Sequence, residues 1–309
     1  MKFAVETWAP EYGASVDEAG PEAASEPVDL AVEVAPAGWA PIAAAGGPPE
    51  GPVRFVDGVR RIEARVWITG ADGLVRQGIC ASYAAGVVVC DGRAAIESAM
   101  VRRALFAPVE GAGPVVTSHG TFVHQPVAAD GPDHLSVALQ GAMAELEHEV
   151  SVGAPPGELL VVDGPLRSRH RMPGAVGYVK THHRSYLPEP LQPVVGRLAA
   201  GERTPVFLID GQSRRWSWYV CLPGERTHVW AAVVRAEVPA DRPLDQVIRL
   251  ADQLGVALPR FASRPHKDAR APQNLYPIAG LERELRRRLG DTNVLQRALR
   301  VAAATTTLL

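Results

Sequence analysis

The sequence predicts an α/β protein in which helices flank a mixed sheet, with additional antiparallel strands and a helical C-terminus. Short apolar runs separated by glycine-rich turns fill residues 53–91, and a helical apolar pattern follows at 133–150. Strand-like runs and helical segments then succeed one another towards the C-terminus. With 309 residues and 47% apolar side chains, the chain can bury a large core.

Residues 1–50 are expected to form an acidic arm rich in Ala, Pro and Gly, partly ordered at best. They carry one Lys and nine acids, and their few large apolar residues cannot offset the entropy of ordering. Trp8, Trp39 and the alternating segment 28–34 could dock on the body. The body, residues 51–309, holds the other 31 of 32 basic residues and 25 of 34 acids, a net charge of +6 that suits a polyanionic partner.

The first half of the body predicts a meander of strands. The runs VRFVDG, RIEARVWIT, GICASYAAG and GVVVCDG each indicate one strand joined to the next by a tight turn. Residues 94–105 predict a short helix, and residues 114–127 predict further extended structure. A longer helix is expected over 133–150, with Asp133 as its N-cap. Its apolar face would carry Leu135, Leu139, Ala142, Leu146 and Val150.

The second half continues with a buried strand, GELLVVDGPL, and a strand in GAVGYVKTHHRSYL that leads into a basic segment. A short helix over 191–200 should end at Gly201. The runs TPVFLIDG, RWSWYVCLP and THVWAAVVRAEVP predict a second antiparallel set. Helices are expected over 243–254, 275–289 and 292–303.

Two strands end on an aspartate followed by glycine, which brings acids towards one sheet edge. These are Asp57 in PVRFVDG and Asp163 in LLVVDG. Asp-Gly is also common in turns, and Asp91 and Asp210 stand in similar motifs. In a ribonuclease-H-like layout, the first and fourth strands place their aspartates side by side, and the intervening helix adds a glutamate. The order of strands, helix and strand matches that layout.

Carboxylates gathered in this way suit a divalent metal. Mg²⁺ and Mn²⁺ prefer oxygen ligands, and a pair of such ions can activate a water and stabilise the leaving oxygen in phosphodiester cleavage. Asp57, Glu145 and Asp163 are the candidate ligands. Glu145 and Glu149 are expected at the border of the apolar helix face, and Glu147 further towards solvent.

These motifs, together with the C-terminal APQNLYPIAGLERELRRRLGD, resemble the NurA nuclease family over most of residues 53–299. The resemblance implies a ribonuclease-H-like nuclease domain over residues 51–309. It also implies a Mn²⁺- or Mg²⁺-dependent DNA hydrolase with 5′–3′ exonuclease and single-strand endonuclease activity. Such proteins form homodimers and act with the hexameric HerA ATPase in double-strand break repair.

The family motifs assign metal-ligand roles to Asp57 and Asp163, and to Glu145 on the helix, with Glu149 as the alternative. Archaeal members of the family carry a C-terminal histidine after a Tyr-Pro pair; here Tyr276 and Pro277 are followed instead by Glu282 and Glu284. Glu282 is the expected fourth ligand and Glu284 its alternative.

Several basic residues are candidates for contact with the substrate. Lys180 could neutralise the scissile phosphate, although a lone lysine at a strand end is as often simply solvated. The candidates for nucleic-acid binding combine charge with nearby aromatic residues or with a loop of unusual composition. They are His183, Arg184, Arg203, Arg214, Arg215, His266, Lys267 and Arg270.

Two rival functions fit the same pattern. One is a non-catalytic adaptor that binds DNA ends or HerA, and the other is a nuclease of RNA or RNA/DNA hybrids. No stretch approaches the ~18 apolar residues of a membrane span, and the first 30 residues lack the features of a signal peptide. The three cysteines are widely spaced. We therefore expect a cytoplasmic protein without disulfides or a membrane partner.

Overall fold

The structure, a computed structural model, describes residues 2–5, 22–23, 26–49, 51–129, 131–155, 157–166, 172, 174–182, 184–211, 213–226 and 228–307. Trp8 and His183 lie outside these residues. The strands are β1 (Lys2–Val5), β2 (Glu22–Ala23), β3 (Val28–Asp29), β4 (Ile42–Ala43), β5 (Val53–Thr69), β6 (Val75–Asp91), β7 (Arg93–Ala107), β8 (Val115–Thr117), β9 (Gly120–Pro126), β10 (Leu159–Asp163), β11 (Ala175–Val179), β12 (Arg184–Ser185), β13 (Glu202–Arg203), β14 (Phe207–Ile209), β15 (Arg215–Cys221) and β16 (Val233–Pro239). The helices are α1 (Pro132–Ser151), α2 (Gln192–Arg197), α3 (Leu244–Ala257), α4 (Tyr276–Leu289) and α5 (Thr292–Thr307).

One mixed sheet organises the molecule, in the strand order β3–β14–β15–β16–β11–β10–β5–β6–β7–β9–β8. Strand β10 runs parallel to both β5 and β11, whereas β5, β6 and β7 are antiparallel neighbours. The predicted α/β class with a mixed sheet flanked by helices is confirmed. The runs predicted as a second antiparallel set continue the same sheet, because β16 pairs with β11.

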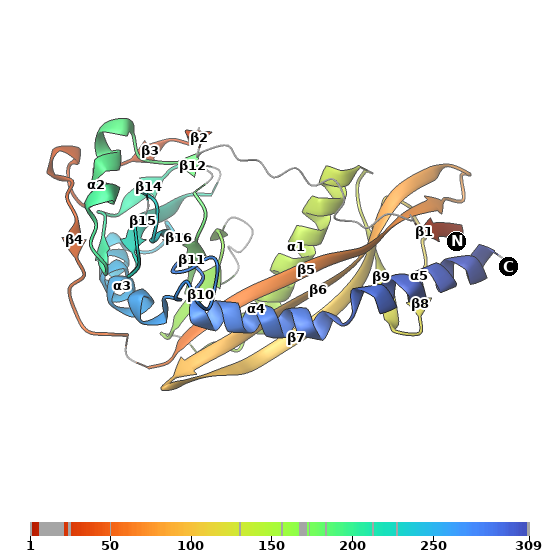
Figure 1. Cartoon of the computed structure of the whole chain (residues 1–309). Coiled ribbons are helices and arrows are strands. Elements are labelled where there is room, and N and C mark those ends of the chain that lie inside the picture. The colour runs from red at the N-terminus through yellow and green to blue at the C-terminus, as the bar shows by residue number, and fades with distance from the viewer. Residues whose placement is uncertain are drawn as a thin grey trace.

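The predicted meander is instead a ribbon of long strands (Figure 1). Strands β5 and β6 have 17 residues each, so each joins two of the predicted short runs. Gly58 and Gly86, expected near turns, lie within these strands. A Cβ on Gly86 would come within 2.8 Å of the Ser98 carbonyl oxygen, so the glycine permits the close approach of β7.

The helix predicted over 94–105 is wrong, since these residues belong to strand β7. Asp91 and Gly92 form the hairpin turn that the sequence favoured at this place, with Gly92 at φ 67°. The turn sets β7 in register with β6, and Leu105 and Phe106 are buried. Strand pairing and burial override the helix propensity of this alanine-containing segment.

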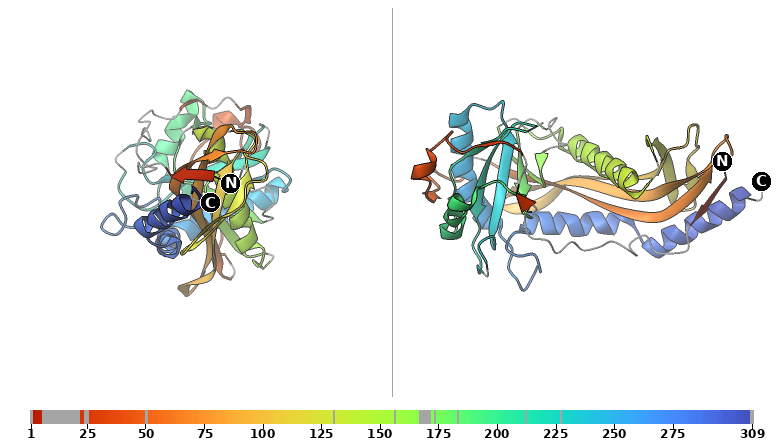
Figure 2. Two further views of the ribbon diagram at one scale, coloured as in Figure 1. Left: turned by 90° about the vertical axis from the view of Figure 1, so that its right-hand side faces the viewer. Right: turned by 90° about the horizontal axis from the view of Figure 1, so that it is seen from above.

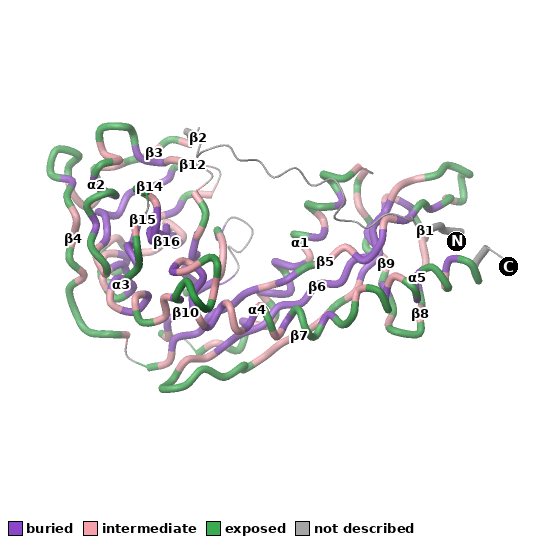
Figure 3. The backbone as a smooth tube through the Cα atoms, in the orientation of Figure 1, coloured by how far each residue is buried: buried purple, intermediate pink, exposed green. Residues whose placement is uncertain are grey.

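Helices α1 and α4 cover opposite faces of the ribbon (Figures 1 and 2). Alternate residues of β6 face the two helices: Ala81, Tyr83 and Ala85 pack in the core that contains Leu135, Leu139 and Leu146 of α1. Ala84 and Val88 pack in the core that contains Ile278, Leu281 and Leu285 of α4. The interior of the ribbon is consequently buried along most of its length (Figure 3).

At the other end of the sheet, α2 and α3 pack against opposite faces of β14 to β16. The end of the acidic arm closes this region: Trp39 is buried, and its indole donates to the carbonyl oxygen of Leu30 at 2.9 Å. Helix α5 packs on the far end of the ribbon, near both chain termini (Figure 1). None of the described helices is long and apolar enough to cross a membrane.

Candidate metal centre and nucleic-acid interface

The two predicted aspartates lie at the same level on neighbouring strands. The parallel register pairs Val162 of β10 with Val56 of β5, so the next residues on the two strands are Asp163 and Asp57. Side chains two residues apart on a strand point to the same face of the sheet, so Asp57 shares a face with Phe55, and Asp163 with Val161. Phe55 and Val161 both pack in the core on the α4 side. Both aspartates therefore point to the face that α4 covers. Asp163 ends β10, whereas Asp57, which was expected at a strand end, lies within β5 because that strand continues to Thr69. The competing Asp91 occupies the hairpin turn, and Asp210 is exposed in an ion pair with Arg214.

Asp57 is a buried acid with a raised pKa. Its residue is only 6% exposed, and its Oδ1 accepts a hydrogen bond from the Gly58 backbone N–H at 2.8 Å. Burial raises the pKa of Asp57 well above its usual range, and the charge of Asp163 raises it further. Lys180 acts in the opposite direction, while Glu147 and Glu282 add to the rise. Four carboxyl groups from four elements are thus close enough to interact electrostatically.

The helix glutamate in this group is Glu147, and not the predicted Glu145. Glu147 is buried, and its Oε1 lies 2.6 Å from where a Cβ on Gly58 would stand, directly after Asp57. Glu145 is exposed. The alternative Glu149 is exposed and binds Arg102 at 2.7 Å. The prediction placed the buried face of the helix beside Glu145. Met143, one turn before Glu147, also faces the core, so the buried face includes Glu147.

Lys180 follows strand β11 and its ammonium contacts Asp163. Lys180 Nζ lies 2.7 Å from Asp163 Oδ2 and donates to Asn274 Oδ1 at 3.0 Å. The other oxygen, Asp163 Oδ1, is buried and has no hydrogen-bond partner among the described residues. A buried carboxylate oxygen without a partner is costly unless a ligand satisfies it. The nearby Tyr178 hydroxyl donates to the Gln273 carbonyl oxygen, and burial raises its pKa.

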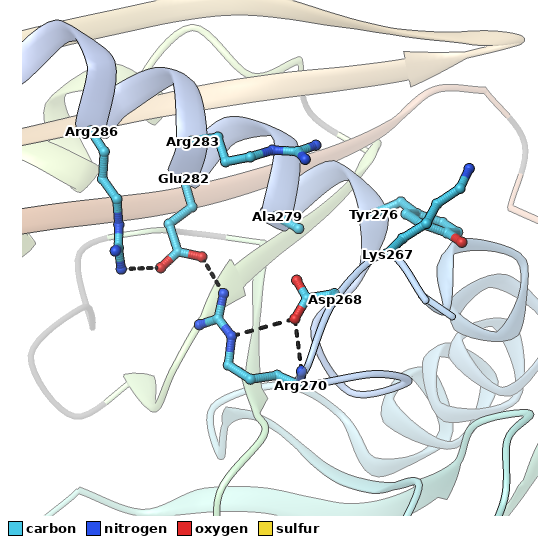
Figure 4. Close-up of a pocket in the computed structure, with 8 residues that line it drawn as sticks. All are labelled: Lys267, Asp268, Arg270, Tyr276, Ala279, Glu282, Arg283 and Arg286. Atoms are coloured by element: carbon cyan, nitrogen blue, oxygen red, sulfur yellow. Dashed lines mark hydrogen bonds and ion pairs between the residues drawn. The ribbon is translucent and has the colours of Figure 1, made fainter. Parts of the chain in front are cut away.

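Glu282 belongs to a chain of ion pairs that connects α4 with the loop before it (Figure 4). Asn274 donates to Asp268 Oδ2 at 2.7 Å, and the backbone N–H of Arg270 donates to Asp268 Oδ1 at 2.8 Å. The Arg270 guanidinium donates to Glu282 Oε2 at 2.5 Å, and Arg286 donates to Glu282 Oε1 at 2.7 Å. Burial opposes ionisation of Glu282, but the hydrogen bond from Arg270 lowers its pKa overall.

The alternative fourth ligand, Glu284, points elsewhere. Its carboxylate accepts hydrogen bonds from Arg287 and Arg288 on the surface of α4, and the bond from Arg287 lowers the pKa of Glu284 to about 2. Glu282, in contrast, is among the charges that raise the pKa of Asp57. Of the two glutamates considered for this position, Glu282 is the one near the aspartates.

The donor chemistry of the group suits a hard divalent cation. The four groups offer only carboxylate oxygens, and Asp163 Oδ1 has capacity for a ligand. As the described side chains lie, however, no three His, Cys, Asp or Glu residues are close enough together to hold a metal ion. Lys180 and Arg270 contact two of the four carboxylates instead. Asp57, Asp163, Glu147 and Glu282 could hold a cation after these contacts adjust.

A basic pocket of about 700 Å³ opens beside Glu282. Its lining comes from the loop before α4 and from the first turns of that helix, and Figure 4 shows the residues: Lys267, Asp268, Arg270, Tyr276, Ala279, Glu282, Arg283 and Arg286. Two of the predicted nucleic-acid contacts, Lys267 and Arg270, lie here. His266 is exposed in the same loop, next to Lys267. Arg283, which no sequence motif marked as a contact, also lines the pocket.

Two other predicted contacts are wrong, because Arg203 and Arg215 are buried in ion pairs. Arg203 binds Glu33 through Nη1 and Nη2 at 3.0 and 2.9 Å, and Asp252 through Nε at 2.7 Å. Arg215 binds Glu237 and Glu26. Each guanidinium is about 2% exposed. They neutralise acids within the protein and are not accessible to a polyanion.

Arg214 is exposed and pairs with Asp210 at 2.8 Å. The backbone of Arg184 pairs with Glu22 in β2, and its side chain lies outside the described structure, as does all of His183. Comparison with protein-family models and with curated proteins finds no match to this chain.

Proposed function

We propose that this chain is a divalent-metal-dependent nuclease of the NurA type that hydrolyses phosphodiester bonds in DNA. The observation that carries the proposal is the placement of Asp57 and Asp163 at the same level on neighbouring strands, with burial and the charges of Asp163, Glu147 and Glu282 raising the pKa of Asp57. A buried acid whose pKa is raised by neighbouring acids is typical of catalytic centres. The basic pocket beside them supplies the charge that a phosphodiester substrate needs.

The topology supports a ribonuclease-H-like arrangement. Strand β5 opens the ribbon β5–β6–β7, helix α1 follows, and β10 then returns to pair in parallel with β5. This places the acid of the opening strand beside that of the strand after the helix, and Glu147 of α1 lies next to Gly58, on the opposite face of β5 from Asp57. The sequence resemblance to NurA nucleases rests on these same motifs.

Each residue has a defined part in the proposed reaction. Asp57, Asp163, Glu147 and Glu282 would hold Mn²⁺ or Mg²⁺, which when bound supplies Lewis-acid stabilisation of the phosphate and activation of a water. Lys180 orients Asp163 now and could turn to the scissile phosphate. Asn274 fixes Lys180 through its amide oxygen. Asp57 holds a proton more strongly than an ordinary aspartate, so it must release that proton when a cation binds.

The test is cleavage of end-labelled DNA, single- and double-stranded, with Mn²⁺, Mg²⁺ or EDTA. We expect metal-dependent cleavage, and a loss of at least ~100-fold in Asp57→Asn, Asp163→Asn and Glu147→Gln, because each removes a group worth several kcal/mol in the transition state. Glu145→Gln, an exposed position on the same helix, is the matched control and should cleave normally. Thermal unfolding of every variant checks that it is folded.

The outcomes separate this proposal from its rivals. If the wild type binds DNA but releases no metal-dependent products, the non-catalytic adaptor is correct. Labelled RNA and RNA/DNA hybrids in the same assay identify a ribonuclease by faster cleavage of those substrates. Equal activity in Glu147→Gln and Glu145→Gln would exclude Glu147 from the site. The proposal also includes a homodimer and a HerA-type ATPase partner, which sedimentation of the protein with and without that ATPase measures.

A further inference from the structure

The basic pocket beside Glu282 holds more cationic charge than its own acids neutralise. Four of its lining side chains are basic (Lys267, Arg270, Arg283 and Arg286) and two are acidic (Asp268 and Glu282). Two positive charges therefore remain without an acidic counterpart inside the pocket. Such a concave site with net positive charge favours an anion.

The positive charge that the acids of the pocket do not neutralise belongs mainly to two side chains. Arg270 and Arg286 already bind Glu282, as the dashed lines in Figure 4 show. Arg283 and Lys267 are exposed, and no carboxylate of the described structure pairs with either. Lys267 lies against the face of Tyr276, with its Nζ 5.5 Å from the ring centre. The two side chains come from the loop and from α4, on either side of the pocket.

The location of the pocket relates it to the carboxylate group. Glu282 lines the pocket and also contributes to the raised pKa of Asp57. An anion in the pocket would thus lie beside Glu282, which itself interacts with Asp57. Successive phosphates of a nucleic-acid strand are separated by one sugar, so a strand with one phosphate at the aspartates can direct the next one towards this pocket.

We infer that the pocket binds the phosphate group next to the scissile one in a single DNA strand, through Arg283 and Lys267. This inference rests on the proposed function, since it takes DNA to be the substrate. A guanidinium and an ammonium that converge on one phosphate form charge-assisted hydrogen bonds. The neighbouring phosphate is a terminal monoester when the strand end enters the site, and an internal diester when the strand passes through it.

The chain of ion pairs gives the pocket a second role. Phosphate in the pocket competes with Glu282 for Arg270 and Arg286, because both guanidinium groups line the pocket and bind the Glu282 carboxylate. Occupation of the pocket therefore frees the Glu282 carboxylate to turn towards Asp57 and Asp163. Substrate binding and assembly of the carboxylate site are coupled through one side chain.

Binding without metal tests the inference separately from cleavage. Fluorescence anisotropy in EDTA would compare a labelled single-stranded oligonucleotide with a 5′-phosphate and the same strand with a 5′-hydroxyl. Arg283→Ala and Lys267→Ala should each weaken binding about tenfold and lower the slope of log affinity against log salt by about one. Arg287→Ala is the matched control, because Arg287 is exposed on the same helix, binds Glu284 and does not line the pocket.

The pattern across the two oligonucleotides identifies the phosphate. A loss confined to the 5′-phosphorylated strand supports a terminal phosphate, and an equal loss with both strands supports an internal one. If Arg283→Ala and Lys267→Ala bind both strands as tightly as Arg287→Ala does, the inference is overturned. Failure of the nuclease proposal looks different, since it would abolish metal-dependent cleavage while these differences in binding remain.

Discussion

Gly58 separates Asp57 from the rest of β5 and leaves room for Glu147, so its replacement tests the carboxylate group directly. A Cβ at this position would stand 2.6 Å from Glu147 Oε1, 2.9 Å from Met143 Cγ and 3.1 Å from Met143 Sδ. Real Cβ atoms do not approach other atoms within 3.0 Å, so the Glu147 carboxylate must move in Gly58→Ala. All three neighbouring atoms belong to flexible side chains.

We expect Gly58→Ala to lose much more activity than stability. Overpacking a core position costs ~1–3 kcal/mol, and replacing glycine within a strand regains ~0.5–1 kcal/mol. We therefore expect the free energy of unfolding of Gly58→Ala to fall by no more than about 2.5 kcal/mol. Misplacement of a catalytic group by about 1 Å, in contrast, costs on the order of 100-fold in rate.

The assay pairs the rate of Mn²⁺-dependent cleavage of labelled single-stranded DNA with urea unfolding. Gly141→Ala is the control, because Gly141 is exposed on α1 and a Cβ there would meet no atom within 4 Å. That variant should cleave normally and gain ~0.5–1 kcal/mol of stability. A Gly58→Ala protein that is folded and cleaves within about twofold of the wild-type rate would refute the placement of Glu147 in the site.

Three further predictions concern charge. Arg203→Ala should lower the free energy of unfolding by ~3–5 kcal/mol in urea titrations, because Glu33 and Asp252 lose their buried partner. Arg214→Ala removes an exposed ion pair and should lower it by less than ~1 kcal/mol. The pKa of Asp57 in the folded protein lies above the ordinary value of 3.8, so Asp57 lowers stability as pH rises from about 4 through that raised pKa. Without metal, Asp57→Asn should consequently unfold at a higher temperature than the wild type at pH 7, and at nearly the same temperature at pH 4. A difference in unfolding temperature that is the same at both pH values would contradict this prediction. Because Asp57 must release its proton when a cation binds, the Mn²⁺ affinity of the wild type, measured by calorimetry, should rise with pH. In Asp57→Asn the part of this pH dependence that comes from Asp57 should be absent.

The positions that sequence could predict are those fixed by local pattern. Asp163 closes a run of four buried apolar residues, and a strand of that kind is expected inside a parallel sheet, where its end meets the end of its neighbour. Asp57 follows a similar run. Their adjacency required only that the two strands pair in register, which the structure shows.

The positions that sequence missed depend on partners far along the chain. Arg203 stands beside strand-like sequence and suggests a surface charge, but its partner Glu33 is 170 residues away. The choice between Glu145 and Glu147 depends on which face of α1 meets the ribbon, and both phases of that helix offer apolar residues. Strand β7 was missed because its local sequence tolerates a helix, while the hairpin with β6 decides its conformation.

The ion pairs of Arg203 and Arg215 change how a shortened protein should be designed. Glu26, Glu33 and Trp39 belong by composition to the acidic arm, yet all three complete the interior around β13 to β15. Removal of residues 1–50 would leave two buried guanidinium groups without these carboxylates, and the product should unfold or aggregate. Removal of residues 1–25 would spare these ion pairs but would delete β1, which pairs with Val66–Thr69 of β5, so a truncation that tests the arm in DNA binding should keep both β1 and residues 26–50.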